Sequence, residues 1–200
     1  MVQHLRAAVA MILAFTLLTG VLYPLAITGI GWVMLHEESL GSLIVKDGKV
    51  IGSSLVGQAF ASDKYFHPRP SATSGPDPSD PSKTVDAPYN AAASTGSNLG
   101  PITQKLLDRV KGDVEVLRAQ GVEGPIPVDA VTASASGLDP DISPETAYLQ
   151  VPRVAKSRAL PDDRVRALVT SQIEDRALGI LGEPHVNVLS LNLALDTLQK

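Results

Sequence analysis

The chain has 200 residues, with 17 Lys and Arg against 21 Asp and Glu, four His and a formal net charge of −4. This mildly acidic balance suits neither nucleic acid nor an anionic lipid surface, so no nucleic-acid partner is expected. Because the chain has no cysteine, a disulfide framework and thiolate metal sites are excluded, and the scattered histidines do not predict a metal site.

Residues 7–35 contain no Asp, Glu, Lys, Arg or His. About 20 consecutive apolar residues cross the hydrocarbon core of a bilayer, so this run predicts a transmembrane helix. Residues 1–6 are then a short cytoplasmic tail. The alternative is a cleaved signal peptide, because Arg6 precedes the run, but a signal h-region has only about 7–15 residues. Pro24 lies inside the run and predicts a kink.

The orientation of this helix depends on few charges. Arg6 precedes the run, while Lys46 and Lys49 follow it, so the positive-inside rule is close to balanced. His4 and the terminal amine give the N-terminus a small bias towards the cytoplasm. Small residues let helices approach closely in a bilayer, and we expect four of them to pack on partner helices. These are Ala10, Ala14, Thr16 and Gly20.

Residues 36–200 are long enough for one soluble domain with its own core. Asp47-Gly48 between two apolar runs predicts a β-hairpin, and a further strand or turn follows over 55–60. Residues 67–101 hold seven of the fifteen prolines and predict a long Pro/Ser/Gly-rich loop, which is either functional or disordered. Clustered aromatic residues near this loop indicate a local satellite core or a contact surface. Those that could pin its ends are Tyr65, Phe66 and Tyr89.

Helical and extended patterns alternate over the following part of the domain. A helix is predicted over 101–121, with Ser97 or Asn98 near its cap. Its apolar stripe consists of Ile102, Leu106, Val110, Val114 and Leu117. A strand over 127–134 and a polar turn over 134–140 are predicted next.

Two more helices and a strand complete the predicted domain. Ser143-Pro144 suits a helix cap and first helical position, and another helix begins at Pro161. The buried stripe of the latter is Val165, Leu168, Val169 and Ile173. Residues 186–191 are predicted to form a strand, and 193–198 a strand or a final helical turn. The expected fold is thus a single N-terminal transmembrane helix followed by one α/β (α+β) extracytoplasmic domain.

Motifs of known enzyme classes are missing from the sequence. It contains no phosphate-binding loop, no dinucleotide fingerprint outside the membrane run, and no S-x-x-K, G-x-S-x-G or H-E-x-x-H motif. No catalytic residue is therefore expected. The alternative is a membrane-anchored extracytoplasmic hydrolase, which would need a nucleophile beside a base, such as Ser97 near His67, or a dyad of His67 and His185.

Two polar segments could bind a ligand or a partner. Ser94–Pro101 precedes the predicted helix, where backbone N–H groups and the helix dipole could hold an anion; the alternative is an ordinary capped helix start. The polar turn Ser134–Pro140 is either a contact site or a turn without further role.

Motifs spread over nearly the whole chain resemble those of one family. They are Tyr23-Pro24, Gly57–Phe60, Tyr65–Ala72, Tyr89-Asn90, Gly96–Pro101, Val131–Ser134, Gly137–Pro140, Ile142–Pro144, Arg153–Ala155, Leu181–Pro184 and Val186–Leu189. In this order and spacing the chain resembles the C subunit of the bacterial high-affinity potassium-transporting P-type ATPase, the Kdp system. It departs from the family pattern at Thr95 and Ala135, where glycine is usual, and at Asp141, where histidine is frequent. Thr95 bears on ATP binding, because its side chain restricts close approach to phosphate.

The resemblance implies a non-catalytic accessory subunit of the potassium import complex. Its implied roles are assembly and stabilisation of the complex, and a catalytic-chaperone role that raises the ATP affinity of the ATPase subunit. The implied partners are the ATPase subunit, a potassium-channel-like subunit and the lipid bilayer. No cofactor is expected on the chain alone, although ATP binding within the complex is possible. The implied location is the bacterial inner membrane, single-pass, with the large domain extracytoplasmic.

The expected partner-contact or nucleotide-linked residues come from these motifs and segments. They are Tyr65, Phe66, Arg69, Tyr89, Ser94, Gly96, Ser97, Asn98, Leu99, Gly100, Ser134, Gly137 and Asp139.

Overall fold

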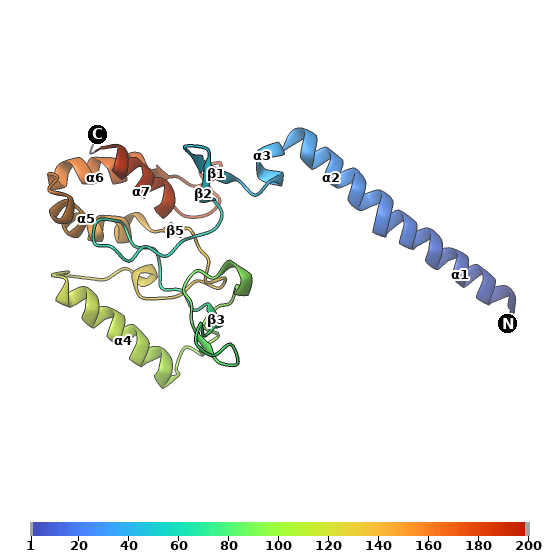
Figure 1. Cartoon of the computed structure of the whole chain (residues 1–200), viewed down its shortest axis with the longest axis horizontal. Coiled ribbons are helices and arrows are strands. Elements are labelled where there is room, and N and C mark those ends of the chain that lie inside the picture. Colours follow the sequence, from blue (N-terminus) through green and yellow to red (C-terminus); the bar gives the residue numbers. More distant parts are fainter. Residues whose placement is uncertain (1, 199–200) are drawn as a thin grey trace. The chain divides into compact units, whose positions relative to one another are not determined.

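The computed structural model describes residues 2–198, which divide into two compact units between Ile44 and Val45. The first unit is dominated by one helix and the second is a mixed helix–sheet domain (Figure 1).

The first unit contains an almost uninterrupted apolar helix. It comprises α1 (Val2–Leu17), a π-helical turn η1 (Leu18–Leu22) and α2 (Tyr23–Met34), followed by the short α3 (His36–Ser39). The stretch His4–Met34 is long and apolar enough to cross a membrane, and none of its most apolar window is buried within the chain. A single candidate membrane helix near the N-terminus is therefore confirmed for the described residues.

Pro24 explains the π-helical turn. Proline lacks an N–H, and its ring clashes with the carbonyl group four residues earlier in a regular α-helix, here that of Gly20. The helix widens just before the proline, and the Tyr23 N–H bonds to the Leu18 carbonyl, five residues back. The expected distortion thus takes the form of a π-bulge, one of the recognised causes of helix bending.

Two hairpins precede the helical part of the second unit. The first pairs β1 (Leu43–Lys46) with β2 (Lys49–Ser53), and Asp47 and Gly48 both have positive φ, as a two-residue type I′ turn requires. This prediction is confirmed, and a bridge between Ser53 and Val56 makes the following segment a turn.

The proline-rich loop contains the second hairpin, which the sequence did not predict. β3 (Ser74–Pro76) pairs antiparallel with β4 (Thr84–Asp86), and the one-turn η2 (Ala91–Ala93) follows. Between the strands, the carboxylates of Asp77 and Asp80 each accept hydrogen bonds from a serine two residues on. These local bonds explain how a segment with few apolar residues folds into a turn.

The remaining elements form the body of the domain. They are α4 (Gln104–Ala119), η3 (Val128–Ala130), β5 (Asp141–Ile142), α5 (Pro144–Arg158), α6 (Asp162–Ser171), β6 (Ile173–Glu174), β7 (His185–Asn187) and α7 (Val188–Thr197). The last three strands form one antiparallel sheet in the order β5-β7-β6. The mixed α+β character of the domain is confirmed.

Three predicted elements are wrong in type or position. The helix expected from Pro101 begins at Gln104, and Ile102, placed in its buried stripe, is 91% exposed. Residues 127–134 are not a strand, because the Asp129 carboxylate accepts three hydrogen bonds from Ser143 and Thr146 and holds the segment as a tight turn against α5. The strand over 186–191 ends at Asn187.

The helix α7 begins there because Asn187 caps it. The Asn187 side chain accepts a hydrogen bond from the Ser190 N–H at 3.1 Å. From Val188 onward, Leu191 and Leu195 recur at helical spacing and are buried. The segment from 193 onward is therefore helical, the second of the two predicted possibilities.

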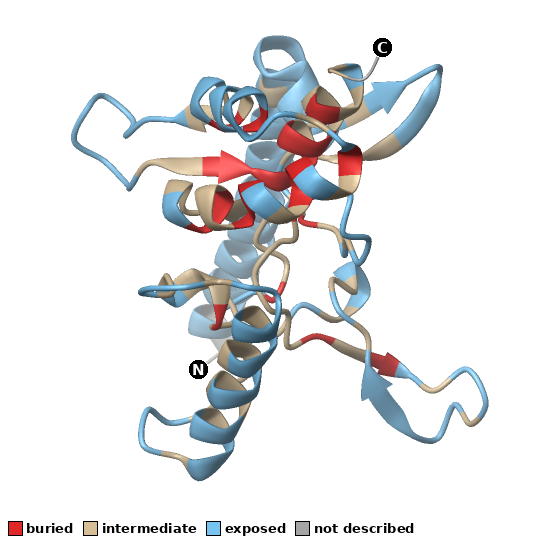
Figure 2. Ribbon diagram, turned by 90° about the vertical axis from the view of Figure 1, so that its left-hand side faces the viewer, coloured by how far each residue is buried: buried red, intermediate tan, exposed pale blue. Residues whose placement is uncertain are grey.

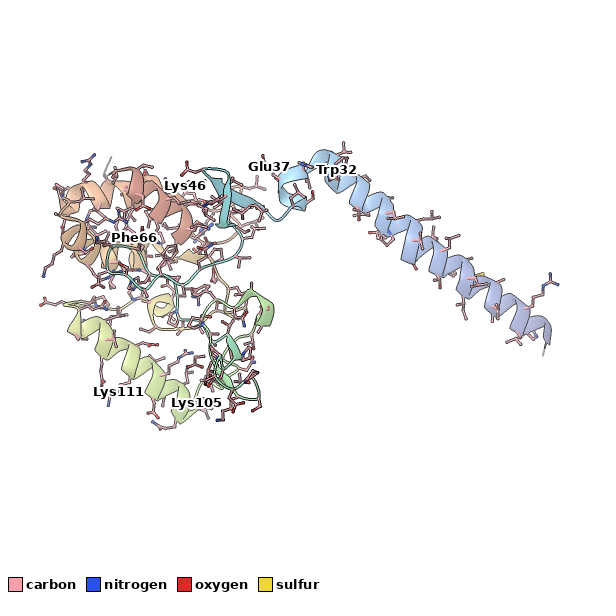
Figure 3. The ribbon with its side chains drawn as sticks, in the orientation of Figure 1. Trp32, Glu37, Lys46, Phe66, Lys105 and Lys111 are labelled. Atoms are coloured by element: carbon pink, nitrogen blue, oxygen red, sulfur yellow. The ribbon has the colours of Figure 1, made fainter. Side chains whose placement is uncertain are left out.

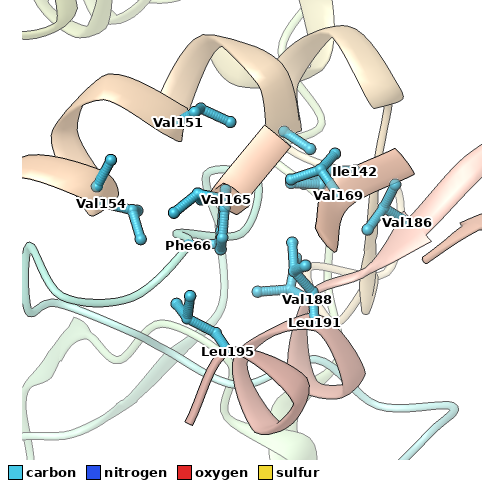
Figure 4. Close-up of a cluster of buried hydrophobic side chains, with 12 residues drawn as sticks. Phe66, Ile142, Val151, Val154, Val165, Val169, Val186, Val188, Leu191 and Leu195 are labelled. Carbon is cyan, nitrogen blue, oxygen red and sulfur yellow. The ribbon is translucent and has the colours of Figure 1, made fainter. Parts of the chain in front are cut away.

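The hydrophobic core lies between α5, α6, α7 and the small sheet (Figure 4). Its fully buried members include Phe66, Ile142, Val151, Val154, Val165, Val169, Val186, Leu191 and Leu195. Of the buried stripe predicted for the helix from Pro161, Val165 and Val169 are buried in this core and Leu168 packs against it, while Ile173 lies in β6. Helix α4 buries no residue fully, and its Lys105 and Lys111 extend into solvent (Figures 2 and 3).

Two side-chain amides hold the extended segment that carries Phe66 against the helices. Asn192 on α7 accepts from the Phe66 N–H at 2.8 Å and donates to the Phe66 carbonyl at 3.0 Å. Gln150 on α5 does the same for His67, at 2.7 and 2.9 Å. Buried backbone groups outside a sheet need such partners, because leaving them unpaired is costly.

We predict that Asn192→Ala lowers the free energy of unfolding by about 2–4 kcal/mol, because two buried backbone groups lose their partner. Thr197→Ala, on the exposed side of the same helix, is the control and should change stability by less than about 0.5 kcal/mol. Urea unfolding of the full chain in detergent measures both. Hydrogen exchange at the Phe66 amide should accelerate in the first variant only; equal protection in both would contradict the prediction.

Candidate functional site

Several of the predicted site residues meet where four loop segments cross. Residues 69–73, 87–90, 94–96 and 134–139 are far apart in the sequence but are joined by side-chain hydrogen bonds. We call these segments the loop crossing. It brings together Arg69, Tyr89, Ser94, Gly96, Ser134, Gly137 and Asp139.

An ion pair and a tyrosine form one side of the loop crossing. Arg69 Nη1 lies 2.7 Å from Asp139 Oδ2, and both side chains are about three-quarters covered. The Tyr89 hydroxyl donates to the Arg69 carbonyl at 2.8 Å. Burial raises the pKa of the Tyr89 phenol, and the Asp139 carboxylate raises it further, so the phenol stays protonated as a donor. The charge of Arg69 is thus neutralised within the chain.

Two hydroxyl residues that sequence reasoning did not select as site residues hold the rest. Ser71 Oγ donates to the Gly137 carbonyl at 2.7 Å and accepts from the Tyr89 N–H at 3.0 Å. Thr73 Oγ1 donates to the Ala87 carbonyl at 2.6 Å and accepts from the Asn90 N–H at 3.1 Å. A signal was present, since these hydroxyl residues follow Arg69-Pro70 in a segment almost without aliphatic side chains.

The other predicted site residues lie elsewhere. Tyr65 packs under the Arg158 guanidinium, 4.7 Å from its ring centroid, and the Phe66 side chain is fully buried in the core. Ser97, Asn98, Leu99 and Gly100 lead towards α4. The sequence prediction that this segment opens directly into a helix is wrong, because the N-cap is Thr103.

A cleft of about 620 Å³ opens beside the loop crossing. Its walls come from residues 67–71 with Tyr89, from Tyr148–Arg153 on α5, and from the C-terminal part of α4. On α4, Asp113 Oδ2 is buried without a hydrogen-bond partner, and burial raises the pKa of this carboxyl against the opposing effect of Arg109. Helix α4 is therefore incompletely packed on this side.

A second cleft, of about 430 Å³, lies on the other side of Arg69 and includes His185. The His185 ring contacts the Glu183 carbonyl at 3.0 Å and approaches the carboxylates of Asp141 and Glu174 at 4.0 and 3.8 Å. His67 lines the first cleft instead. The two histidines therefore belong to different sites and do not form the dyad considered above.

The geometry does not favour a hydrolase either. The His67 ring contacts the Ser62 carbonyl at 3.1 Å and Arg153 at 3.4 Å, and Ser97, which the structure also describes, shows no hydrogen bond to it. Burial lowers the pKa of His67, and the positive charge of Arg153 lowers it further. A nucleophile beside a general base is not assembled from this pair.

Two residues of the Ser94–Gly100 segment are packed or hydrogen-bonded within the chain. A Cβ built at Gly96 would lie 2.8 Å from the Ala135 carbonyl oxygen, so this glycine permits close packing within the chain rather than access for phosphate. The Ser94 hydroxyl donates a hydrogen bond to the Ser136 carbonyl at 3.0 Å. Arg69, the cation of the loop crossing, forms an ion pair with Asp139. These polar groups satisfy one another.

We predict that Gly137→Ala destabilises the domain by about 3 kcal/mol, because φ is +68° and the added methyl group would lie 2.5 Å from the Thr95 carbonyl oxygen. Gly124→Ala is the matched control, with φ of +83° and nothing within 4 Å, and should cost only about 1 kcal/mol. Thermal unfolding of both variants measures the difference. Equal shifts would show that the loop crossing is not tightly packed.

Comparisons with known proteins agree over nearly the whole chain. The family model of KdpC, described as K+-transporting ATPase, c chain, matches residues 5–197. The potassium-transporting ATPase KdpC subunit of Methylobacterium nodulans is 60% identical over 198 residues, covering 99% of this chain and 98% of that protein. The Bradyrhizobium diazoefficiens subunit is 59% identical over 196 residues, 98% of each chain, and that of Methylorubrum extorquens 56% over 200 residues, all of each. The chain therefore belongs to the KdpC family, the c chain of the K+-transporting ATPase, and is an accessory subunit of that complex rather than its catalytic ATPase.

Proposed function

We propose that this chain assembles and stabilises the potassium-transporting complex, with its N-terminal helix packed against helices of the ATPase subunit and of a potassium-channel-like subunit. The observation that carries the proposal is the distribution of small residues on a helix that is apolar on all sides. An isolated lipid-exposed helix has no need of such residues, whereas helix–helix contacts in membranes favour them.

The four small residues selected from the sequence, Ala10, Ala14, Thr16 and Gly20, form two separate strips. Ala10 and Ala14 are four residues apart and share one side of α1. Thr16 and Gly20 are also four apart, and a Cβ at Gly20 would lie 4.0 Å from the Thr16 methyl group. Two residues, or about 200° of rotation, separate Ala14 from Thr16, so the strips lie on nearly opposite sides of the helix. Two strips suit a helix that is placed between two neighbours.

The second part of the proposal concerns ATP. With the large domain outside the bacterial inner membrane and the chain crossing once, ATP lies on the other side of the bilayer. We therefore assign the catalytic-chaperone role, an increase in the ATP affinity of the ATPase subunit, to contacts with that subunit and not to nucleotide binding by this chain. The self-satisfied polar groups of the loop crossing support this assignment. The outer surface of the loop crossing, including the turn Ser134–Pro140, is then available for contact with the ATPase subunit.

We predict that Ala14→Leu and Gly20→Leu, tested separately in the whole complex, each lower the amount of partner subunits that co-purify in mild detergent. The bulkier side chains keep the neighbouring helix backbone at a distance. Ala8→Leu is the matched control, since Ala8 is exposed on α1 and lies in neither strip. Potassium-stimulated ATP hydrolysis should fall in parallel. Full assembly and transport by a complex that lacks this chain would refute the proposal.

We also predict that the full chain in detergent shows no heat of binding with millimolar ATP, while the KM of the complex for ATP rises when the chain is omitted. Titration calorimetry and steady-state ATPase assays measure the two quantities. Saturable ATP binding by the chain alone would contradict an indirect role, whatever the outcome for assembly.

A further inference from the structure

The connection between β6 and β7 presents large aliphatic side chains to solvent. We call residues 175–184 the finger. Leu178 is 89% exposed, Ile180 76% and Leu181 59%, and every residue from 174 to 183 is exposed. Single exposed aliphatic residues are common, whereas contiguous exposed apolar patches are a feature of interaction sites.

Hydrogen bonds within the finger hold its tip in one conformation. The backbones of Ala177 and Leu181 exchange hydrogen bonds of 2.9 and 3.0 Å, and the Gly179 N–H bonds to the Arg176 carbonyl at 2.9 Å. Below this pair, Arg176 Nη2 and Glu183 Oε2 form an ion pair at 2.5 Å. The aliphatic side chains are thus preorganised before any partner binds, which lowers the entropic cost of association.

The backbone at the tip is strained at Leu178, and no contact within the described residues offsets this strain. Leu178 has φ of +55°, a conformation that glycine and asparagine adopt far more readily than leucine. Its side chain is almost fully exposed, so no intrachain packing compensates for the strain. A leucine at this position is explained if its side chain is buried by another molecule.

The charges at the base of the finger indicate what that molecule is. The tip from 177 to 182 is uncharged, while Glu174, Asp175 and Glu183 outnumber Arg176 below it. An anionic lipid surface attracts basic segments, and the finger has no Trp, Tyr or Lys to place at a membrane interface. A second copy of this chain in a two-fold contact would set one acidic base against another.

We propose that the finger inserts Leu178, Ile180 and Leu181 into an apolar pocket with a basic rim on another subunit of the potassium-transporting complex. This inference rests on the proposed role of the chain as an assembled subunit. It adds a defined contact, independent of the membrane helix, through which the folded domain is attached to a partner protein.

Cross-linking in the assembled complex identifies the neighbour of the finger. Ile180→Cys introduces the only cysteine of this chain, which can carry a photoactivatable label. Lys156→Cys, exposed on α5, is the control. Mass spectrometry should find the label of residue 180 on another subunit. Attachment to lipid, to a second copy of this chain, or to no protein in an intact complex would overturn the inference.

Substitutions measure how much the contact contributes. The double variant Leu178→Asn/Ile180→Asn should lower the affinity of the chain for the rest of the complex about tenfold or more. Ile102→Asn, at a residue that is 91% exposed, should change it by no more than about twofold. Leu178→Asn alone should leave thermal stability unchanged or raised, because asparagine tolerates positive φ. A loss of affinity with intact folding then reports on the contact itself.

The outcomes separate this inference from the proposed function. If the unaltered chain does not associate with the complex, the proposed function fails. If it associates and the double variant associates equally well, only the inference about the finger fails. Asp175→Lys provides a further check, because reversing one rim charge should slow association with a basic partner and reduce its dependence on salt.

Discussion

The arrangement of the domain depends on the hydrogen bonds by which the side-chain amides of Asn192 and Gln150 hold the backbone of Phe66 and His67. An extended segment that joins no sheet enters the core only if side chains replace the missing strand partners. Asn192 and Gln150 do so, and Arg153 and Arg158 donate to the carbonyls of Tyr65 and Lys64. The chain therefore leaves the core at a fixed point after His67, and everything that follows, beginning with Arg69, is positioned from there.

The elements that could be predicted from the sequence are those whose signals are local. Asp47-Gly48 specifies its own turn, and Ser143-Pro144 caps α5 with its own side chain. One error falls where a distant partner decides. Residues 127–134 look extended until Asp129 accepts the hydrogen bonds of Ser143 and Thr146. The start of α7 was missed because an apolar run suits a strand as well as a buried helix, and only the cap at Asn187 distinguishes them.

The loop crossing shows the same limit at the level of a site. Family motifs led to Arg69, Tyr89, Gly137 and Asp139 one by one, but no local pattern predicts that Arg69 pairs with a residue 70 positions away. Ser71 and Thr73 join three of the segments; Ser71 lies in the family motif Tyr65–Ala72 and Thr73 follows it directly, but neither was selected as a site residue. What they do becomes visible only when the carbonyls and amides they bridge are placed around them.

The domain thus separates its internally paired polar groups from its exposed apolar groups. In the loop crossing, the Arg69 guanidinium pairs with the Asp139 carboxylate, and the hydroxyls of Ser71 and Tyr89 donate to backbone carbonyls. These polar groups are therefore occupied within the chain. Large aliphatic side chains are exposed on the candidate membrane-spanning helix His4–Met34 and at the tip of the finger. Polar groups that hydrogen-bond to one another within the chain make the domain rigid. Apolar groups that stay exposed are available for contacts with other molecules. Both properties suit the proposed role of this chain in holding a complex together.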